Sequence, residues 1–94
     1  MPIIRIPSQL RPDTDGKDAV TIEAGNVSEA IAGLVKAFPA LKERLYDEKG
    51  NVRRYVNIYL GDEDVRFLDN METSLNADSE ISLVPAIAGG SEFK

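Results

Sequence analysis

Residues 26–38 carry the most regular pattern in the chain, and it predicts one amphipathic helix. Apolar side chains recur there at spacings of three and four residues, which places them on a single helix face. Asn26 and Glu29 have the spacing of a capping box, in which each side chain accepts a hydrogen bond from the other's free backbone N–H. Pro39 ends the helix. The apolar face consists of Val27, Ala30, Ile31, Leu34, Val35 and Phe38.

The layer that faces this helix is predicted to be a sheet, because the rest of the chain contains short β-branched or alternating segments. Within 55–60 the alternation places Val56, Ile58 and Leu60 on the face toward the helix. A short helical turn is expected at 41–46, with loops at 8–18 and 68–78. The predicted strands are 3–6, 19–23, 55–60, 65–67 and 81–87.

The order of these elements indicates the fold class. Two strands, one helix and three further strands form an α+β arrangement in the order of the β-grasp, or ubiquitin-like, roll. We therefore expect a mixed sheet of about four to five strands packed on one main helix. Residues 1–88 are expected to form this domain, and residues 89–94 a flexible C-terminal Gly-Gly segment with a tail.

The composition argues against a self-contained enzyme. Cysteine and histidine are absent, so a thiolate nucleophile, the commonest general base and the commonest metal ligand are all missing. Asp62, Glu63 and Asp64 indicate a solvated turn rather than a metal site, since consecutive side chains on a tight turn point apart. The net charge of −5 disfavours nucleic acid, and no apolar run is long enough to span a membrane. We expect a cytoplasmic monomer that is not an enzyme and binds no metal.

Tyr55, Asn57 and Tyr59 are predicted to lie on the sheet face that points away from the helix, because the residues between them face the helix. Exposed aromatic residues on a sheet commonly anchor partner proteins. Val84 and Ala86 extend this face toward the C-terminus. These five residues are our candidate docking residues, and ordinary cross-strand pairing is the alternative explanation.

Gly89-Gly90 directly follows the last predicted strand. Neither glycine has a Cβ, so the segment from Ala88 to Gly90 can thread a narrow tunnel and deliver a terminal carboxyl to a distant active site. The alternative is a plain C-terminal turn, since Gly-Gly pairs are common in turns.

Three segments together resemble the ThiS/MoaD family of sulfur carriers, and within it the CysO-type carriers of cysteine synthesis in actinobacteria. The resemblance spans nearly all of the chain, and no single segment would suffice alone. The segments are Ile6-Pro7 with Leu10-Arg11-Pro12, Arg54-Tyr55-Val56-Asn57-Ile58-Tyr59 with Asp62-Glu63-Asp64-Val65-Arg66-Phe67, and Leu83-Val84-Pro85-Ala86-Ile87-Ala88-Gly89-Gly90.

This resemblance implies that partner enzymes act on Gly90. An E1-like enzyme would adenylate the Gly90 carboxylate with ATP, and a sulfur donor would displace AMP to leave a thiocarboxylate. The sulfur would attack an activated serine derivative on a PLP-dependent acceptor enzyme, and the thioester would rearrange by an S-to-N acyl shift. A JAMM-type zinc metalloprotease would then release cysteine. The carrier itself would bind no cofactor, because ATP and the sulfur donor are used by the partner enzyme.

The sequence departs from the simplest family pattern because Ser91-Glu92-Phe93-Lys94 follows Gly90. The Gly90 carbonyl is then part of an amide and has no carboxylate to activate. Some relatives carry short tails that a JAMM-type protease removes, so the bond between Gly90 and Ser91 is the expected cleavage site. The alternative is a cloning remnant, because Glu-Phe is a frequent translation of a restriction site. We also hypothesise that Phe93, which is within reach of the outer sheet face, lets the uncut tail block docking.

The sequence leaves open which product or function Gly90 serves. The sulfur could serve homocysteine or methionine synthesis, or another sulfur metabolite, instead of cysteine. A ubiquitin-like modifier would form an isopeptide through Gly90 with lysines of other proteins. An interaction domain without terminal chemistry is a third class, and it would tolerate Gly90→Ala, whereas the other two would not.

Overall fold

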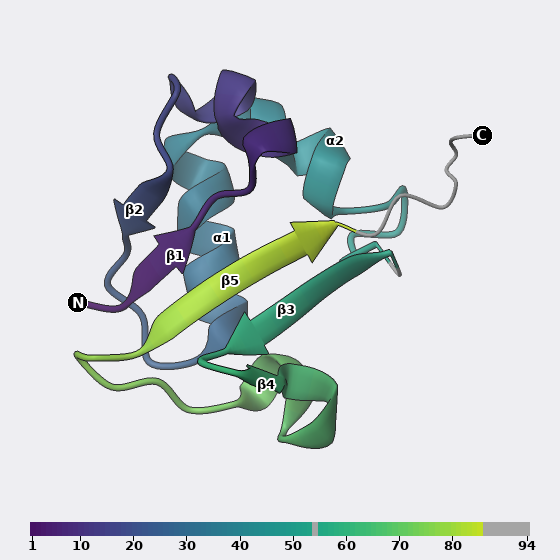
Figure 1. Ribbon diagram of the computed structural model, residues 1–94. Helices are drawn as coiled ribbons and strands as arrows, with labels where there is room; N and C mark the ends of the chain where they lie inside the picture. Colours follow the sequence, from purple (N-terminus) through teal and green to yellow (C-terminus); the bar gives the residue numbers. More distant parts are fainter. Residues whose placement is uncertain (54, 86–94) are drawn as a thin grey trace.

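Five strands form one mixed sheet, and helix α1 (Val27–Ala37) lies across one of its faces (Figure 1). The structure, a computed structural model, describes residues 1–53 and 55–85. The short helix α2 (Lys42–Leu45) follows α1 in the same layer. The strands are β1 (Ile3–Arg5), β2 (Ala19–Thr21), β3 (Val56–Leu60), β4 (Glu63–Asp64) and β5 (Glu80–Pro85).

The strand order is β2-β1-β5-β3-β4, so the last strand of the chain occupies the centre of the sheet. β1 pairs with β5 in parallel, and every other pairing is antiparallel. β2 and β3 therefore run in the same direction, and α1 belongs to the connection between them. This topology confirms the expected α+β roll with one main helix.

The start of α1 follows the predicted cap with one difference. The Oδ1 atom of Asn26 accepts a hydrogen bond from the Glu29 N–H at 2.8 Å, as expected. The Glu29 carboxylate, however, accepts from the N–H of Gly25 at 2.7 Å rather than from that of Asn26. Glu29 thus reaches one residue further back and ties the incoming loop to the first turn.

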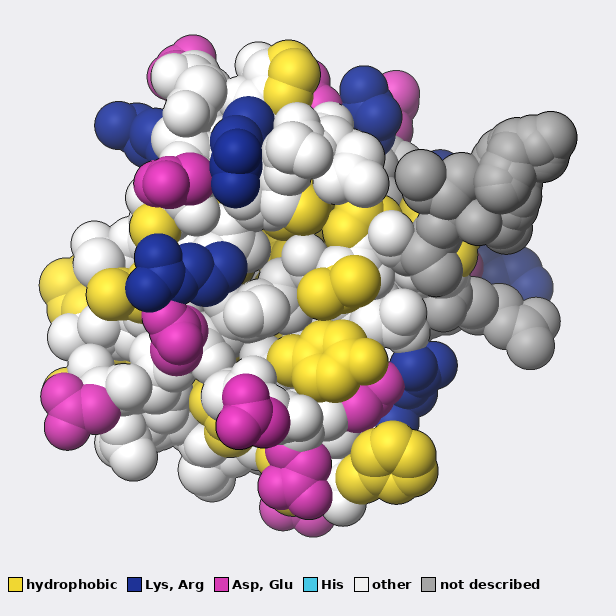
Figure 2. Space-filling model, in the orientation of Figure 1, with side chains coloured by type: hydrophobic (Ala, Val, Ile, Leu, Met, Phe, Trp, Pro, Cys, Tyr) yellow, Lys and Arg dark blue, Asp and Glu magenta, His cyan; other side chains and the backbone are white. Residues whose placement is uncertain are grey.

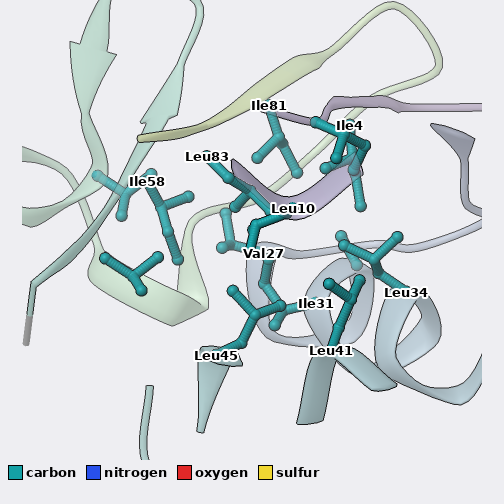
Figure 3. Close-up of a cluster of buried hydrophobic side chains, with 14 residues drawn as sticks. Ile4, Leu10, Val27, Ile31, Leu34, Leu41, Leu45, Ile58, Ile81 and Leu83 are labelled. Carbon is teal, nitrogen blue, oxygen red and sulfur yellow. The ribbon is translucent and has the colours of Figure 1, made fainter. Parts of the chain in front are cut away.

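The core between sheet and helices is built from aliphatic side chains (Figure 3). In this view side chains of β1, β3 and β5 point toward α1, and the buried side chains of Leu41 and Leu45 lie in the same core. The fully or nearly fully buried set is Ile4, Ile6, Leu10, Val27, Ala30, Ile31, Leu34, Leu41, Leu45, Val56, Ile58, Val65, Ile81 and Leu83.

Four local predictions were wrong. The 8–18 loop contains a 3-10 helix, Ser8–Thr14, held by the buried Thr14 hydroxyl, which donates to backbone carbonyls. The expected strand at 65–67 is a 3-10 turn, Val65–Phe67, because the Asp64 side chain caps it. A second 3-10 turn, Asn70–Glu72, interrupts the irregular segment after it. Tyr55 lies in the turn before β3 rather than in the strand.

Candidate functional site: the outer sheet face and the end of β5

The sheet face opposite α1 is open, and the central strands supply its middle. In β5, Ile81 and Leu83 are buried while Val84 is 45% exposed. In β3, Val56 and Ile58 are buried, so the residues between them face outward. Figure 2 shows hydrophobic side chains on this front face, over β5 and β3.

Four outward residues of β3 and β5 are direct neighbours, and we call them the docking strip. Asn57 pairs with Val84, and Tyr59 pairs with Ser82. Side chains paired across antiparallel strands have Cβ atoms about 4.5–5.5 Å apart, so they form one continuous surface. The strip contains three of the five candidate docking residues. The fourth, Tyr55, is 42% exposed beside the start of β3, and the fifth, Ala86, lies outside the described residues.

Arg66 lies at one edge of the docking strip and is held from two sides. Its guanidinium contacts the Asp64 carboxylate, with 2.7 Å between Nη2 and Oδ2, and it also donates to Oδ1 of Asn57. The backbone N–H of Arg66 donates to Asp64 Oδ1 at 2.9 Å. Asp64 is therefore not the solvated residue expected from the sequence, since its side chain is only 8% exposed.

These contacts change the acidity of Asp64. The side-chain hydrogen bond from Arg66, the backbone N–H and the positive charge lower the pKa of the Asp64 carboxyl below its ordinary value, although burial opposes them. The same partnership raises the pKa of the Arg66 guanidinium. Both side chains are therefore charged near neutral pH, and their opposite charges cancel each other.

A second ion pair lies on the other side of the docking strip. Arg5 of β1 contacts Glu80 of β5, with 2.6 Å between Nε and Oε2, and both side chains are about half exposed. Such exposed pairs stabilise a fold by at most about 1 kcal/mol. Within each of the two ion pairs beside the strip, the opposite charges compensate each other. A partner can therefore cover Val84 and Tyr59 without having to neutralise these charges.

Acidification should reveal the Asp64 contact. The Asp64 pKa is lowered from about 3.8 in the folded state, so its ionised form stabilises the fold above that pH. This contribution is lost as the pH falls through the folded pKa. Asp64→Asn should lower the urea midpoint at neutral pH and flatten its fall as the pH drops below about 4. The exposed Asp62→Asn is the control, and equal pH profiles for the two variants would contradict the assignment.

The end of β5 determines where the C-terminal segment begins. Pro85 is the last residue of β5 and pairs with Val56 at the start of β3. The segment therefore leaves the sheet at the Val84 end of the docking strip. The remaining predicted site residues, Ala88, Gly89, Gly90 and Ser91, lie outside the described residues.

Sequence reasoning missed two features of this region. Phe67 is 81% exposed on the 3-10 turn that follows β4, where a strand had been expected. The signal that could have found this turn is Asp64, since aspartate is a favoured N-cap residue. A cleft of about 440 Å³ also escaped prediction, because its lining comes from distant segments. Its lining includes Val52, Arg53, Val56, Ile58, Val65 and Met71.

The described residues contain no cluster of potential metal ligands. Across 1–53 and 55–85, no group of three or more acidic side chains is placed to hold a metal ion. In the same part of the chain, no helix is long and apolar enough to cross a membrane. The region therefore consists of the docking strip, an ion pair on either side of it and the start of the C-terminal segment.

Residues 4–90 match the ThiS family. The chain belongs to the ThiS family. Sulfur carrier protein CysO of Mycobacterium tuberculosis is 36% identical over 89 residues, which cover 93% of this chain and 96% of that protein. Among solved structures, a chain of the Amycolatopsis orientalis BexX/CysO complex is 32% identical with a TM-score of 0.85. That match covers 96% of this chain and 100% of the other. The small archaeal modifier protein 1 of Methanosarcina acetivorans is 25% identical, with a TM-score of 0.84 and 95% of each chain covered.

Proposed function

We propose that this ThiS-family protein is a sulfur carrier of the CysO type that works through Gly90. The observation that carries the proposal is the extent of the family match, which runs to Gly90 and leaves Ser91 to Lys94 outside it. The same boundary separates the Gly-Gly pair from the tail. The protein would contribute a carboxylate and a docking surface, and its partners would supply the catalysis.

The first proposed step is hydrolysis of the peptide bond between Gly90 and Ser91. Water adds to the Gly90 carbonyl, the C–N bond breaks, and the tail leaves with a free amino group. A zinc metalloprotease of the JAMM type is the proposed partner. The new Gly90 carboxylate supplies the oxygen nucleophile that the amide lacked.

The next steps exchange an oxygen of that carboxylate for sulfur. A carboxylate oxygen attacks the α-phosphorus of ATP on an E1-like enzyme and displaces pyrophosphate. A sulfur donor then attacks the acyl carbon, and AMP leaves, so that Gly90 ends in a thiocarboxylate. A PLP-dependent acceptor enzyme receives this sulfur, and cysteine is the proposed product because the 36% identical relative is a CysO protein.

The second candidate is a protein modifier conjugated through Gly90. It is favoured by the similarity to the small archaeal modifier protein 1, at 25% identity and over 95% of each chain. Both candidates use the same activation of the carboxylate. They differ in the acceptor, which is a small metabolite in the first case and a lysine amine in the second.

Intact-mass measurement on the untagged protein from its native cell tests the proposal. We expect a chain that ends at Gly90, with a fraction in which one sulfur atom replaces one terminal oxygen. Cleavage without sulfur, together with isopeptide-linked adducts, would favour the modifier. Retention of Ser91 to Lys94 throughout, in cells that make the partner enzymes, would contradict both candidates.

The docking strip gives this proposal a second test. In a chain that ends at Gly90, Val84→Asp should weaken binding to the adenylating enzyme about 30-fold, since an anchoring contact contributes about 2 kcal/mol. Binding can be measured by calorimetry. Thr21→Asp is the matched control, because it places the same charge at an exposed position on the distant edge strand β2. Equal affinity of the two variants would remove Val84 from the interface.

A further inference from the structure

A cleft of about 440 Å³ lies on the side of β3 that faces away from the docking strip. Its lining comes from the loop before β3, from β3 itself and from the 3-10 turns after β4. Val56 and Ile58 contribute to the cleft from the inner face of β3, whereas the docking strip lies on the outer face of the same strand. The cleft and the strip are therefore separate surfaces, and Arg66 borders both of them.

The floor of this cleft is apolar. Val56, Ile58 and Val65 are almost fully buried and form its base. Val52 and Met71 pack against the core from two different segments and remain partly exposed. Ligand pockets in proteins are mainly apolar and have volumes of roughly 300–1,000 Å³, so this cleft is at the small end of that range. It has room for one or two side chains of a peptide.

The rim of the cleft carries a positive charge in an acidic protein. Arg53 and Arg66 line the cleft together with one acidic residue, Asp64, so two positive charges and one negative charge leave a formal excess of +1. The chain as a whole has a net charge of −5. Because Asp64 already pairs with Arg66, the remaining charge is that of Arg53. A carboxylate is therefore the group that complements this rim.

Arg53 is held in place although its charge is not matched. Its backbone N–H donates to the Leu45 carbonyl at 2.8 Å, and its Nε atom donates to the Glu43 carbonyl at 2.9 Å. Glu43 and Glu48 line a neighbouring cleft together with Arg53. Within residues 1–53 and 55–85, however, no carboxylate lies within 4.0 Å of the Arg53 guanidinium nitrogens. Its terminal nitrogens can therefore bind both oxygens of a carboxylate, and little ordering of the side chain is needed.

We propose that this cleft is a second docking site, which binds a partner's peptide segment with an apolar side chain next to a carboxylate. The apolar side chain lies on the floor formed by Val56, Ile58 and Val65, and the carboxylate binds the Arg53 guanidinium. The site does not depend on the chemistry at Gly90. Because it lies on the other face of β3, a partner held here leaves the docking strip accessible to another protein.

An NMR titration of the 94-residue chain with the peptide acetyl-Glu-Leu-Glu-amide tests the site. We expect a Kd in the millimolar range, because so short a peptide makes few contacts. The methyl signals of Val65 and Met71 should shift, whereas those of Val84 in the docking strip should not. The peptide acetyl-Lys-Leu-Lys-amide has the same apolar side chain with the opposite charges. It should bind at least about tenfold more weakly, since it loses the contact with Arg53 and is repelled by it.

Two variants test the role of charge in the cleft. Arg53→Gln should weaken binding of the Glu-Leu-Glu peptide about tenfold, and Arg5→Gln, the same change at an exposed position on β1, should leave it unchanged. Asn70→Asp adds a negative charge to the lining without changing the side-chain size, and aspartate tolerates the φ of 54° at this position. It should weaken binding about threefold or more even if Arg53→Gln disturbs the loop before β3.

Three results would overturn the proposal. The first is equal affinity for the two peptides, and the second is a set of shifts confined to Val84. The third is a concentration-dependent shift of the Val65 and Met71 signals in the protein alone, because a second copy of the chain would then occupy the cleft. None of these results involves Gly90, so the second docking site and the carrier function are tested separately.

Discussion

A chain that ends at Gly90 should be adenylated by its E1-like enzyme, whereas the 94-residue chain should show only background activity. The reason is chemical, because the Gly90 carbonyl of the longer chain is an amide and offers no carboxylate oxygen to the α-phosphorus of ATP. Pyrophosphate exchange with purified proteins measures this step directly. We expect the 94-residue chain to lose pyrophosphate exchange completely, rather than to show a partly reduced rate.

The control for this experiment is a chain that ends at Ser91. It has a free carboxylate, but one that is displaced by a residue and carries a side chain, and we expect little or no exchange. Activity of the Ser91 chain equal to that of the Gly90 chain would show that the enzyme accepts any nearby carboxylate. Activity of the 94-residue chain would contradict the assignment of Gly90, since it would require activation at Lys94.

The second large effect concerns the fold. Leu34 is fully buried in the middle of α1, where it packs in the aliphatic core against the sheet. Leu34→Ala should reduce the free energy of unfolding by about 3 kcal/mol, through lost apolar burial and the cavity left behind. That is a substantial share of the roughly 5–14 kcal/mol expected for a domain of this size. Thermal unfolding should shift down by roughly 12–24 °C.

Lys36→Ala, on the exposed side of the same helix, is the matched control for Leu34→Ala. It should change the unfolding free energy by less than about 0.5 kcal/mol, because it removes no buried contact. Urea denaturation monitored by circular dichroism measures both variants. A loss below about 1 kcal/mol for Leu34→Ala would mean that the neighbouring side chains collapse into the space.

The parts of the fold that were predictable have strong local signals. The spacing of Val27, Ile31 and Leu34 and the Asn26 cap specify α1 from its own residues. The alternation of residues 56–60 likewise assigns Asn57 and Tyr59 to the outer face. These patterns survive in the structure because the local preference and the tertiary packing agree.

The parts that were not predictable depend on contacts between distant residues or on very short segments. A run as short as Val65–Phe67 is compatible with a strand or a 3-10 turn, and the cap from Asp64 decides between them. The burial of Asp64 follows from its contact with Arg66. In the sequence alone, Asp64 is only one of several charged residues on a predicted turn. The proposed role of Gly90 comes from resemblance to a family, since no physical property of a Gly-Gly pair specifies sulfur chemistry.

The central position of β5 has a mechanical consequence. A partner that draws the C-terminal segment into a tunnel pulls on a strand that is hydrogen-bonded to β1 on one side and to β3 on the other. Such a force acts along two ladders at once, so their hydrogen bonds share the load. An edge strand would instead detach from a single neighbour. The segment thus continues from a strand with two sheet neighbours, which helps the domain to stay folded while its end is held by another protein.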